Sequence, residues 1–419
     1  MRFVHVADVH LDTSFAGRSE AARQRLRDAS REAFAQAVQL AITEEAHAFL
    51  VAGDLFDSDR LSLRTERFML EQLAELGDHG ITVVYATGNH DPGSAPNGPR
   101  RLPWPSHVHV VSDATPRRIL VPDATGTPVG YVTAVGHASA EERADLSRGF
   151  MRPSAEIADL PQVALLHTQV HHSLGAEAHH PYAPSELSFL MRAGYDYWAL
   201  GHVHERQGLS DDPPIWYAGS LQGRTHAERG ARGALLVDLS DRDAPAVTFR
   251  PLAPVRWETL VADRLEGVRS LDELLRHVQL AWEAERRLDP ATAATAWMAR
   301  VILSGPCPLW AELRSEEDRE HVAAELCELL GALEVTVGAD GVHPVVSLSE
   351  HAARVDVLGE ALRLIAAVRR GDVSLGIAAA DLVGVGGDDP ATVDRYVREL
   401  LERGDGELAA RMLETHARD

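Results

Sequence analysis

Residues 195–206, YDYWALGHVHER, contain an apolar run that stops at a glycine and is followed by two histidines separated by one valine. On a β-strand, residues i and i+2 face the same side, about 6.7 Å apart along the chain. His202 and His204 are therefore expected to share one face at the end of a buried strand. Two histidines in that position are either solvated or hold a common ligand.

Four further apolar runs precede this one, and each ends at a polar cluster. They are RFVHVA (2–7), AFLVA (48–52), ITVVYAT (81–87) and VALLH (163–167). Apolar residues with helical spacing predict helices over 19–46, 62–80 and 183–194. Strands that alternate with helices predict an α/β fold. The segments 232–240 and 246–252 are expected to form a later hairpin.

The bulk composition is that of a folded protein with two or three domains, because the 419-residue chain is 45% hydrophobic and 25% charged. Its only cysteines are Cys307 and Cys327, so a disulfide framework is excluded and a reducing compartment is expected. We find no signal peptide and no membrane-length apolar run, and we expect a cytoplasmic protein. The net charge of −22 argues against a broadly basic nucleic-acid surface, but it permits a local groove whose positive charge comes from metal ions.

The sequence changes in character near residues 256 and 349. Residues 1–255 carry the alternating strands and helices. Residues 256–348 contain two helical stretches and two predicted strands, at 299–305 and 333–338, which indicates a small α+β domain. Residues 349–419 are mostly helical, with helices expected over 350–370 and 390–419 and a glycine-rich break at 384–389.

Side chains of the types that commonly bind metal ions follow five of the predicted strands. They are Asp8 and His10, Asp54, Asn89 and His90, His167, and His202 and His204. In open α/β sheets, ligand sites gather at the carboxyl ends of strands. Carboxylates, an amide and imidazoles suit a divalent ion such as Mn²⁺, and the lack of cysteine disfavours a structural zinc site. These candidate ligands are more than one metal ion requires, which favours a site for two ions. Two ions roughly 3.5–4 Å apart can contact the attacking and leaving oxygens of a phosphoryl transfer.

These motifs, in this order, resemble the calcineurin-like metallophosphoesterase superfamily over residues 1 to about 230. The motifs are Asp-x-His (8–10), Gly-Asp-x-x-Asp (53–57), Gly-Asn-His-Asp (88–91), His167 and Gly-His-Val-His (201–204). The resemblance implies a four-layer α/β/β/α sandwich. It also implies that Asp54 bridges two ions, one held by Asp8, His10 and His204 and the other by Asn89, His167 and His202. His90 would be a catalytic residue that faces the scissile phosphate.

Several stretches are also similar to the SbcD-type DNA repair nucleases, and most of all to their YhaO branch, as far as about residue 258. These stretches are MRFVHVADVHLDTSF (1–15), VAGDLFDS (51–58), YDYWALGHVHERQ (195–207) and PPIWYAGSLQGRTHAERGARGALLVDL (213–239). The likeness implies a DNA nuclease, both 3′–5′ exonuclease and single-strand endonuclease, that uses two Mn²⁺ ions, with Mg²⁺ or Fe as alternatives. It further implies a capping domain that touches DNA, a homodimer, and a C-terminal region that docks on an SbcC-like coiled-coil ABC ATPase.

Asp57 departs from many SbcD proteins, which have histidine at this position, and matches the phosphatases of the superfamily. We expect its carboxylate to orient His90. Arg224 is expected to bind substrate phosphate. Because Asp57 matches the phosphatases, a phosphatase or cyclic-nucleotide phosphodiesterase on the same core is an alternative function. A non-catalytic scaffold for DNA ends or the ATPase is another alternative. The C-terminal helices are as consistent with closing the protein's own core as with docking a partner.

Other histidines are expected to be loop or core residues rather than ligands. They are His137, His171, His172, His179 and His180.

Overall fold

The computed structural model describes residues 1–57, 61–95, 101–175, 177, 180–242, 244–288, 294, 296–345, 348–378, 390–401, 406, 408–409 and 412. The chain divides into two compact units. The first comprises Met1–Glu258 with Ala291–Met298, and the second comprises Thr259–Pro290 with Ala299–Asp419. The glycine-rich break predicted at 384–389 lies outside the described residues.

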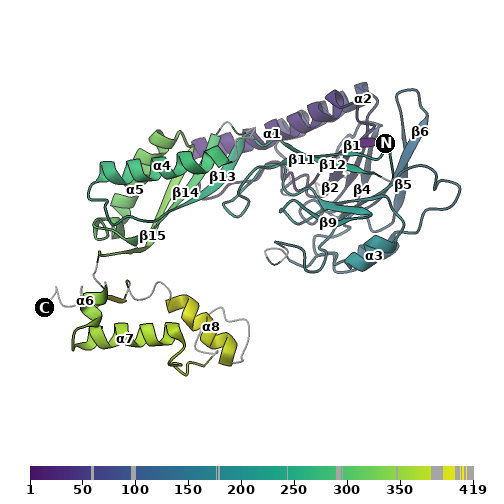
Figure 1. Ribbon diagram of the computed structural model, residues 1–419. Coiled ribbons are helices and arrows are strands. Elements are labelled where there is room, and N and C mark those ends of the chain that lie inside the picture. The colour runs from purple at the N-terminus through teal and green to yellow at the C-terminus, as the bar shows by residue number, and fades with distance from the viewer. Residues whose placement is uncertain are drawn as a thin grey trace. The chain divides into compact units, whose positions relative to one another are not determined.

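Two six-stranded sheets form the centre of the first unit (Figure 1). The first has the order β12-β11-β1-β2-β3-β4, and the second has the order β5-β6-β7-β8-β10-β9. The strands of the first sheet are β1 (Arg2–Val6), β2 (Ala48–Ala52), β3 (Thr82–Ala86), β4 (Val108–Val111), β11 (Gly233–Asp238) and β12 (Ala246–Pro251). The strands of the second are β5 (Arg117–Pro122), β6 (Pro128–Val135), β7 (Gln162–His167), β8 (Tyr197–Gly201), β9 (Gln207–Asp211) and β10 (Pro214–Tyr217).

Parallel pairing aligns the strand ends that matter for the site. In the first sheet β1, β2 and β3 run parallel, and in the second β6, β7 and β8 run parallel. Their carboxyl ends therefore lie at one edge of each sheet, as expected for a ligand site in an α/β protein.

Alternate residues of the central strands face different layers, because successive side chains of a strand point to opposite sides. Phe49 and Val51 of β2 pack with Phe34 in an outer apolar cluster. Leu50, between them, packs with Leu165 of β7 in the cluster between the two sheets.

Helices cover the outer faces of both sheets. The first sheet packs with α1 (Glu20–Thr43) and α2 (Leu63–Asp78), whose N-caps Ser19 and Ser62 accept hydrogen bonds from backbone amides in the first turn. The second sheet packs with α3 (Leu187–Arg192) through Leu190. The first unit is therefore an α/β/β/α sandwich, and the predicted fold class is confirmed.

The five apolar runs and the hairpin predicted from the sequence all form strands, as β1, β2, β3, β7, β8 and the antiparallel pair β11–β12. Strands β4, β5, β6, β9 and β10 were not predicted. Most of these are short or lie at or near a sheet edge, and β5 and β9 expose many of their residues, so their sequences lack a long apolar run.

The rest of the chain adds a three-stranded sheet and a set of helices. The sheet has the order β13-β14-β15, with β13 (Val255–Ala262), β14 (Ala296–Pro306) and β15 (Glu334–His343). The helices are α4 (Leu271–Leu288), α5 (Glu316–Leu330), α6 (Leu348–Ala352), α7 (Val357–Arg370) and α8 (Pro390–Leu401). The helix expected over 350–370 is interrupted, because Asp356 caps α7 by accepting a hydrogen bond from Gly359 N at 2.8 Å.

The predicted domains at 256–348 and 349–419 stay a prediction.

In the described part of the chain, no helix combines the length and the apolar character needed to cross a membrane.

Candidate metal centre

The loops that leave β1 and β2 carry Asp8, His10 and Asp54 in a left-handed backbone conformation, with φ values of 49°, 48° and 51°. This conformation is uncommon for residues other than glycine, and non-glycine residues that adopt it cluster at functional sites. The two loops are bound together, because His10 N donates to Asp54 O at 2.9 Å and Asp8 N donates to Gly53 O at 3.2 Å. The backbone thus directs three of the predicted ligands from neighbouring strand ends.

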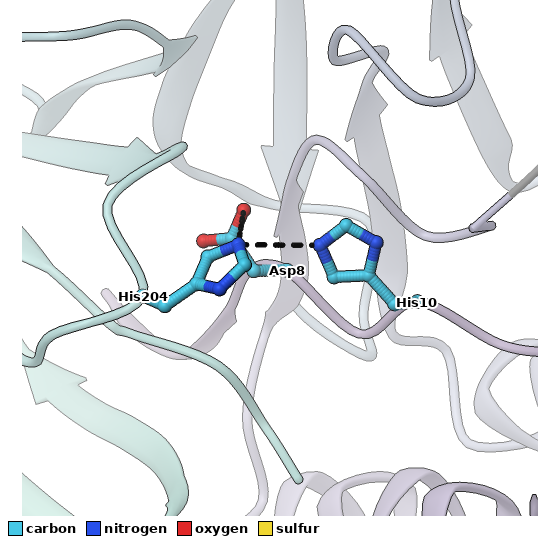
Figure 2. Close-up of side chains that lie close together, drawn as sticks. All are labelled: Asp8, His10 and His204. Atoms are coloured by element: carbon cyan, nitrogen blue, oxygen red, sulfur yellow. Dashed lines mark hydrogen bonds and ion pairs between the residues drawn. The ribbon is translucent and has the colours of Figure 1, made fainter. Parts of the chain in front are cut away.

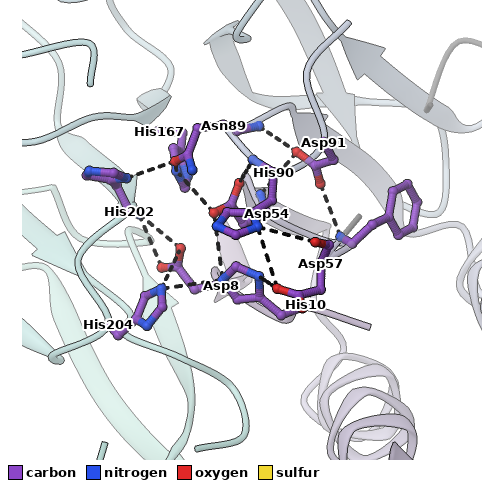
Figure 3. Close-up of polar contacts among 12 residues, drawn as sticks. Asp8, His10, Asp54, Asp57, Asn89, His90, Asp91, His167, His202 and His204 are labelled. Atoms are coloured by element: carbon purple, nitrogen blue, oxygen red, sulfur yellow. Dashed lines mark hydrogen bonds and ion pairs between the residues drawn. The ribbon is translucent and has the colours of Figure 1, made fainter. Parts of the chain in front are cut away.

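Asp54 lies between the two predicted sets of ligands (Figure 3). Its Oδ2 atom is 3.6 Å from His10 Nε2 and 3.6 Å from His167 Nε2. Its Oδ1 atom accepts a hydrogen bond from His90 N at 2.9 Å. One carboxylate oxygen therefore faces a histidine of each set, as a bridging ligand must.

The first set is Asp8, His10 and His204, which Figure 2 shows converging from two sheets. His10 Nε2 and His204 Nε2 are 3.3 Å apart, and His204 Nε2 is 3.8 Å from Asp8 Oδ1. Burial raises the pKa of Asp8 to about 7 and holds the pKa of His10 well below its usual value. A cation among these atoms would oppose the effect of burial on Asp8 by favouring the carboxylate.

The second set is Asn89, His167 and His202. His167 Nε2 and His202 Nδ1 each lie 3.0 Å from Asn89 Oδ1. The other ring nitrogens contact backbone carbonyls, His167 Nδ1 with Ala52 O at 2.9 Å and His202 Nε2 with His180 O at 2.8 Å. Since a backbone carbonyl only accepts, these contacts favour the tautomer that has the proton on His167 Nδ1 and His202 Nε2.

The donor set of this second group fits a divalent cation. Burial keeps the pKa of His167 well below its usual value, so its ring is neutral and Nε2 presents a lone pair. In a neutral His202 ring, Nδ1 presents a lone pair as well. Two such nitrogens and the Asn89 carbonyl oxygen then converge without a proton between them, an arrangement that a cation stabilises. The structure brings all seven predicted ligands together, and their roles as ligands stay a prediction.

His90, Asp57 and Arg224 lie beside the first set. The exposed His90 ring places Nδ1 3.3 Å from Asp57 O and 3.5 Å from Asp57 Oδ1. The same Asp57 oxygen lies 3.0 Å from His10 Nδ1 and accepts a hydrogen bond from Arg224 Nη1 at 2.7 Å. Asp57 is therefore close enough to orient His90, but the nearest partner of the Asp57 carboxylate is the guanidinium group of Arg224. A phosphate contact by Arg224 stays a prediction.

Asp91 is a buried carboxylate to which the sequence analysis assigned no role. It accepts hydrogen bonds from Gly88 N at 2.7 Å, from Leu55 N at 2.6 Å and from Tyr85 Oη at 2.5 Å. These bonds tie the loop that carries Asn89 to the loop that carries Asp54. Its place in the Gly-Asn-His-Asp motif was the available signal.

Glu228 is the second carboxylate without an assigned role, and it lies behind His204. Its Oε1 atom is 3.4 Å from His204 Nδ1 and 3.7 Å from Arg224 Nε. Burial alone would raise the pKa of Glu228, but the contact with His204 and the charge of Arg224 lower it to about 2. In turn, although burial lowers the pKa of His204, the hydrogen bond with Glu228 and the charge of Asp8 raise it. No spacing in the sequence pointed to this contact.

The remaining histidines form other contacts. His137 Nε2 donates to His167 O at 2.8 Å, and His171 lies 3.6 Å from Glu186. His180 contributes its backbone carbonyl to the orientation of His202. His179 lies outside the described residues.

Comparisons with known proteins relate the first half of the chain to one family. Residues 1–206 match the family model for calcineurin-like phosphoesterases. The uncharacterized metallophosphoesterase YhaO of Bacillus subtilis (strain 168) is 29% identical over 315 residues, which are 74% of this chain and 73% of that protein.

Two named nuclease or repair proteins are also similar. The DNA double-strand break repair protein Mre11 of Aeropyrum pernix is 31% identical over 254 residues, which are 59% of each chain. The SbcD component of the nuclease SbcCD from Rhodobacter capsulatus is 27% identical over 317 residues, which are 66% of this chain and 74% of that protein. The chain thus spans three quarters or less of the length of each relative.

Proposed function

Residues 1–206 form a calcineurin-like phosphoesterase domain, and from that premise we propose that the chain is a DNA nuclease with a dinuclear metal centre. The observation that carries the proposal is the position of Asp54 Oδ2, 3.6 Å from a histidine of each ligand set. The similarity to Mre11 and to the SbcD component of SbcCD supports DNA as the substrate. The cleavage modes are proposed to be those of a 3′–5′ exonuclease and a single-strand endonuclease.

The proposed ligands are Asp8, His10 and His204 for one ion, Asn89, His167 and His202 for the other, and Asp54 for both. Two divalent ions, proposed to be Mn²⁺, supply positive charge that polarises the phosphate and favours ionisation of the attacking water. This local charge also has an electrostatic role, because a chain with a net charge of −22 repels DNA.

His90 is the proposed catalytic residue. Its backbone N–H donates to Asp54 Oδ1, and its ring Nδ1 atom lies beside Asp57, so the backbone and one side of the ring are held in place. Because the side chain is exposed, its Nε2 atom is available to a substrate. We assign it to hydrogen bonding with, and protonation of, the leaving oxygen.

The remaining proposals concern partners. A helical region beyond residue 348 that docks on an SbcC-like coiled-coil ABC ATPase is consistent with the resemblance to the SbcD component of SbcCD. A homodimer and a cytoplasmic location belong to the same proposal.

A second candidate function is a phosphatase or cyclic-nucleotide phosphodiesterase on the same metal centre. Asp57 favours it, because this position carries the carboxylate of the phosphatases rather than the histidine of many SbcD proteins. The contacts of Asp57 with His10, His90 and Arg224 support a role for this carboxylate in the site.

A substrate comparison distinguishes these functions. The Mn²⁺-loaded protein is incubated with labelled single-stranded DNA, blunt duplex DNA, cyclic AMP and para-nitrophenyl phosphate. We expect cleavage of DNA, and we expect His90→Ala to reduce the rate about 10²–10⁴-fold while both ions remain bound. Hydrolysis of the small phosphates alone would favour the second candidate. Two bound ions without hydrolysis of any substrate would favour a scaffold.

A further inference from the structure

Both histidines of the Asp8 set direct their second ring nitrogen toward a carboxylate. His10 Nδ1 is 3.0 Å from Asp57 Oδ1, and His204 Nδ1 is 3.4 Å from Glu228 Oε1. Histidines that bind metals commonly donate their other N–H to a carboxylate, which fixes the ring and its tautomer. At His204 the structure already provides this carboxylate partner, Glu228, although Glu228 belongs to none of the metallophosphoesterase motifs.

Arg224 joins the two carboxylates. Its Nη1 atom is 2.7 Å from Asp57 Oδ1, and its Nε atom is 3.7 Å from Glu228 Oε1. Glu228 is only 6% exposed, and a carboxylate at that depth needs a compensating charge. The guanidinium supplies that charge to Glu228 and to Asp57 together, so the three side chains form one network behind His10 and His204.

The other histidines of the centre depend on the backbone instead. His167 and His202 donate to the carbonyls of Ala52 and His180. A side-chain substitution at position 228 therefore affects the His204 set and leaves the partners of His167 and His202 unchanged.

We infer that Glu228 is a positioning residue that keeps the proton of His204 on Nδ1, so that Nε2 faces the cation shared with His10 and Asp8. Arg224 Nη2 also lies 3.4 Å from His204 Nδ1. Without the Glu228 carboxylate, this donor would favour the opposite tautomer, with the proton on Nε2, where it blocks a metal bond. The inference rests on the proposed dinuclear centre and adds a residue outside it.

The test is a Mn²⁺ titration of the metal-free, full-length protein, measured by calorimetry. Glu228→Leu removes the acceptor, whereas Glu228→Gln keeps an amide oxygen at the same position. The matched control is Glu205→Gln, because Glu205 neighbours His204 in the chain but is exposed and pairs with Arg232. We expect Glu228→Leu to weaken one of two binding equivalents about 10–100-fold, with a smaller loss for Glu228→Gln. The second equivalent, and both equivalents in Glu205→Gln, are expected to be unchanged.

A purely structural role would give a different pattern, in which both equivalents weaken together and Glu228→Gln offers no rescue over Glu228→Leu. That result, or wild-type binding in both variants, overturns the inference and leaves the dinuclear centre in place. Wild-type protein that fails to bind two Mn²⁺ ions overturns the proposed function as well, so the two failures are distinguishable.

Discussion

At the candidate metal centre, Asp54 makes structural contacts through both its backbone and its side chain. It adopts a left-handed backbone conformation, its carbonyl accepts a hydrogen bond from His10 N, and its carboxylate lies near His90 N and two histidines proposed as ligands. A left-handed aspartate costs of order 1–3 kcal/mol unless its surroundings compensate, which is consistent with a functional constraint at this position.

The prediction at the scale of single residues concerns Asp54→Asn. The substitution removes the charge that both proposed ions share, so we expect the affinity for both Mn²⁺ equivalents to fall. Substitution of a residue that only hydrogen-bonds to a metal ligand typically lowers metal affinity about 10–100-fold, and we expect a larger loss here. Metal analysis after gel filtration, together with calorimetric titration, measures this. Asp123→Asn, in the exposed turn between β5 and β6, is the control and should bind two ions. Full Mn²⁺ binding by Asp54→Asn would contradict the bridging role.

At the scale of elements, the site depends on how closely the strand ends approach one another. Gly88 follows β3, and a Cβ atom built there would lie 2.2 Å from Asp54 Oδ1 and 2.8 Å from Asp54 N. Gly53 follows β2, and a Cβ atom there would lie 2.2 Å from His167 Nδ1. Glycine at position 88 lets two loops of the first sheet meet without a steric clash, and glycine at position 53 lets the first sheet approach His167 at the end of β7 in the second.

The prediction for this scale is that Gly88→Ala displaces the Asp54 carboxylate. We expect a loss of Mn²⁺ affinity and a decrease of about 1–3 kcal/mol in the free energy of unfolding, because the added methyl group overpacks a buried contact. Denaturant unfolding and metal titration measure the two effects. Gly267→Ala is the matched control, since no atom lies within 4 Å of a Cβ built there. Equal stability and equal metal binding in the two variants would show that the close approach is unimportant.

At the scale of the whole molecule, the proposed catalytic groups all belong to the first unit, Met1–Glu258 with Ala291–Met298. The helices beyond residue 348 form small apolar clusters of their own in the part of the chain that the structure describes. Leu358 and Leu362 pack with Ala409, and Val368 packs with Val393 and Val397. These contacts connect the C-terminal helices to one another.

A truncated protein that ends at residue 348 tests what this region does. We expect it to bind two Mn²⁺ ions and to hydrolyse DNA at the full-length rate, because no proposed ligand is removed. We also expect it to lose co-elution with a coiled-coil ABC ATPase that binds the full-length chain. Circular dichroism checks that the truncated protein folds. Loss of folding would instead indicate that these helices close the protein's own core.

Much of the fold was accessible from local patterns, because buried parallel strands are continuous apolar runs that end at polar residues. β2 and β7 illustrate this, since all their residues are buried. β5 and β9 could not be predicted in this way, because their pairing with neighbouring strands, rather than an apolar sequence, makes them strands. In the candidate site, the Gly-Asn-His-Asp and Gly-His-Val-His motifs predicted which residue types would act as ligands and in what order along the chain, whereas Glu228 stands in no such motif.

By itself, the sequence determined the fold class and the residues at the strand ends, because burial and strand periodicity are written in the order of neighbouring residues. Only the tertiary structure decided which atoms converge and which partners orient them. Asp54 meets His167 across 113 positions of the chain, and Asp57 meets Arg224 across 167. Such contacts arise because two sheets pack face to face and bring distant loops to one edge, and no local pattern encodes that distance.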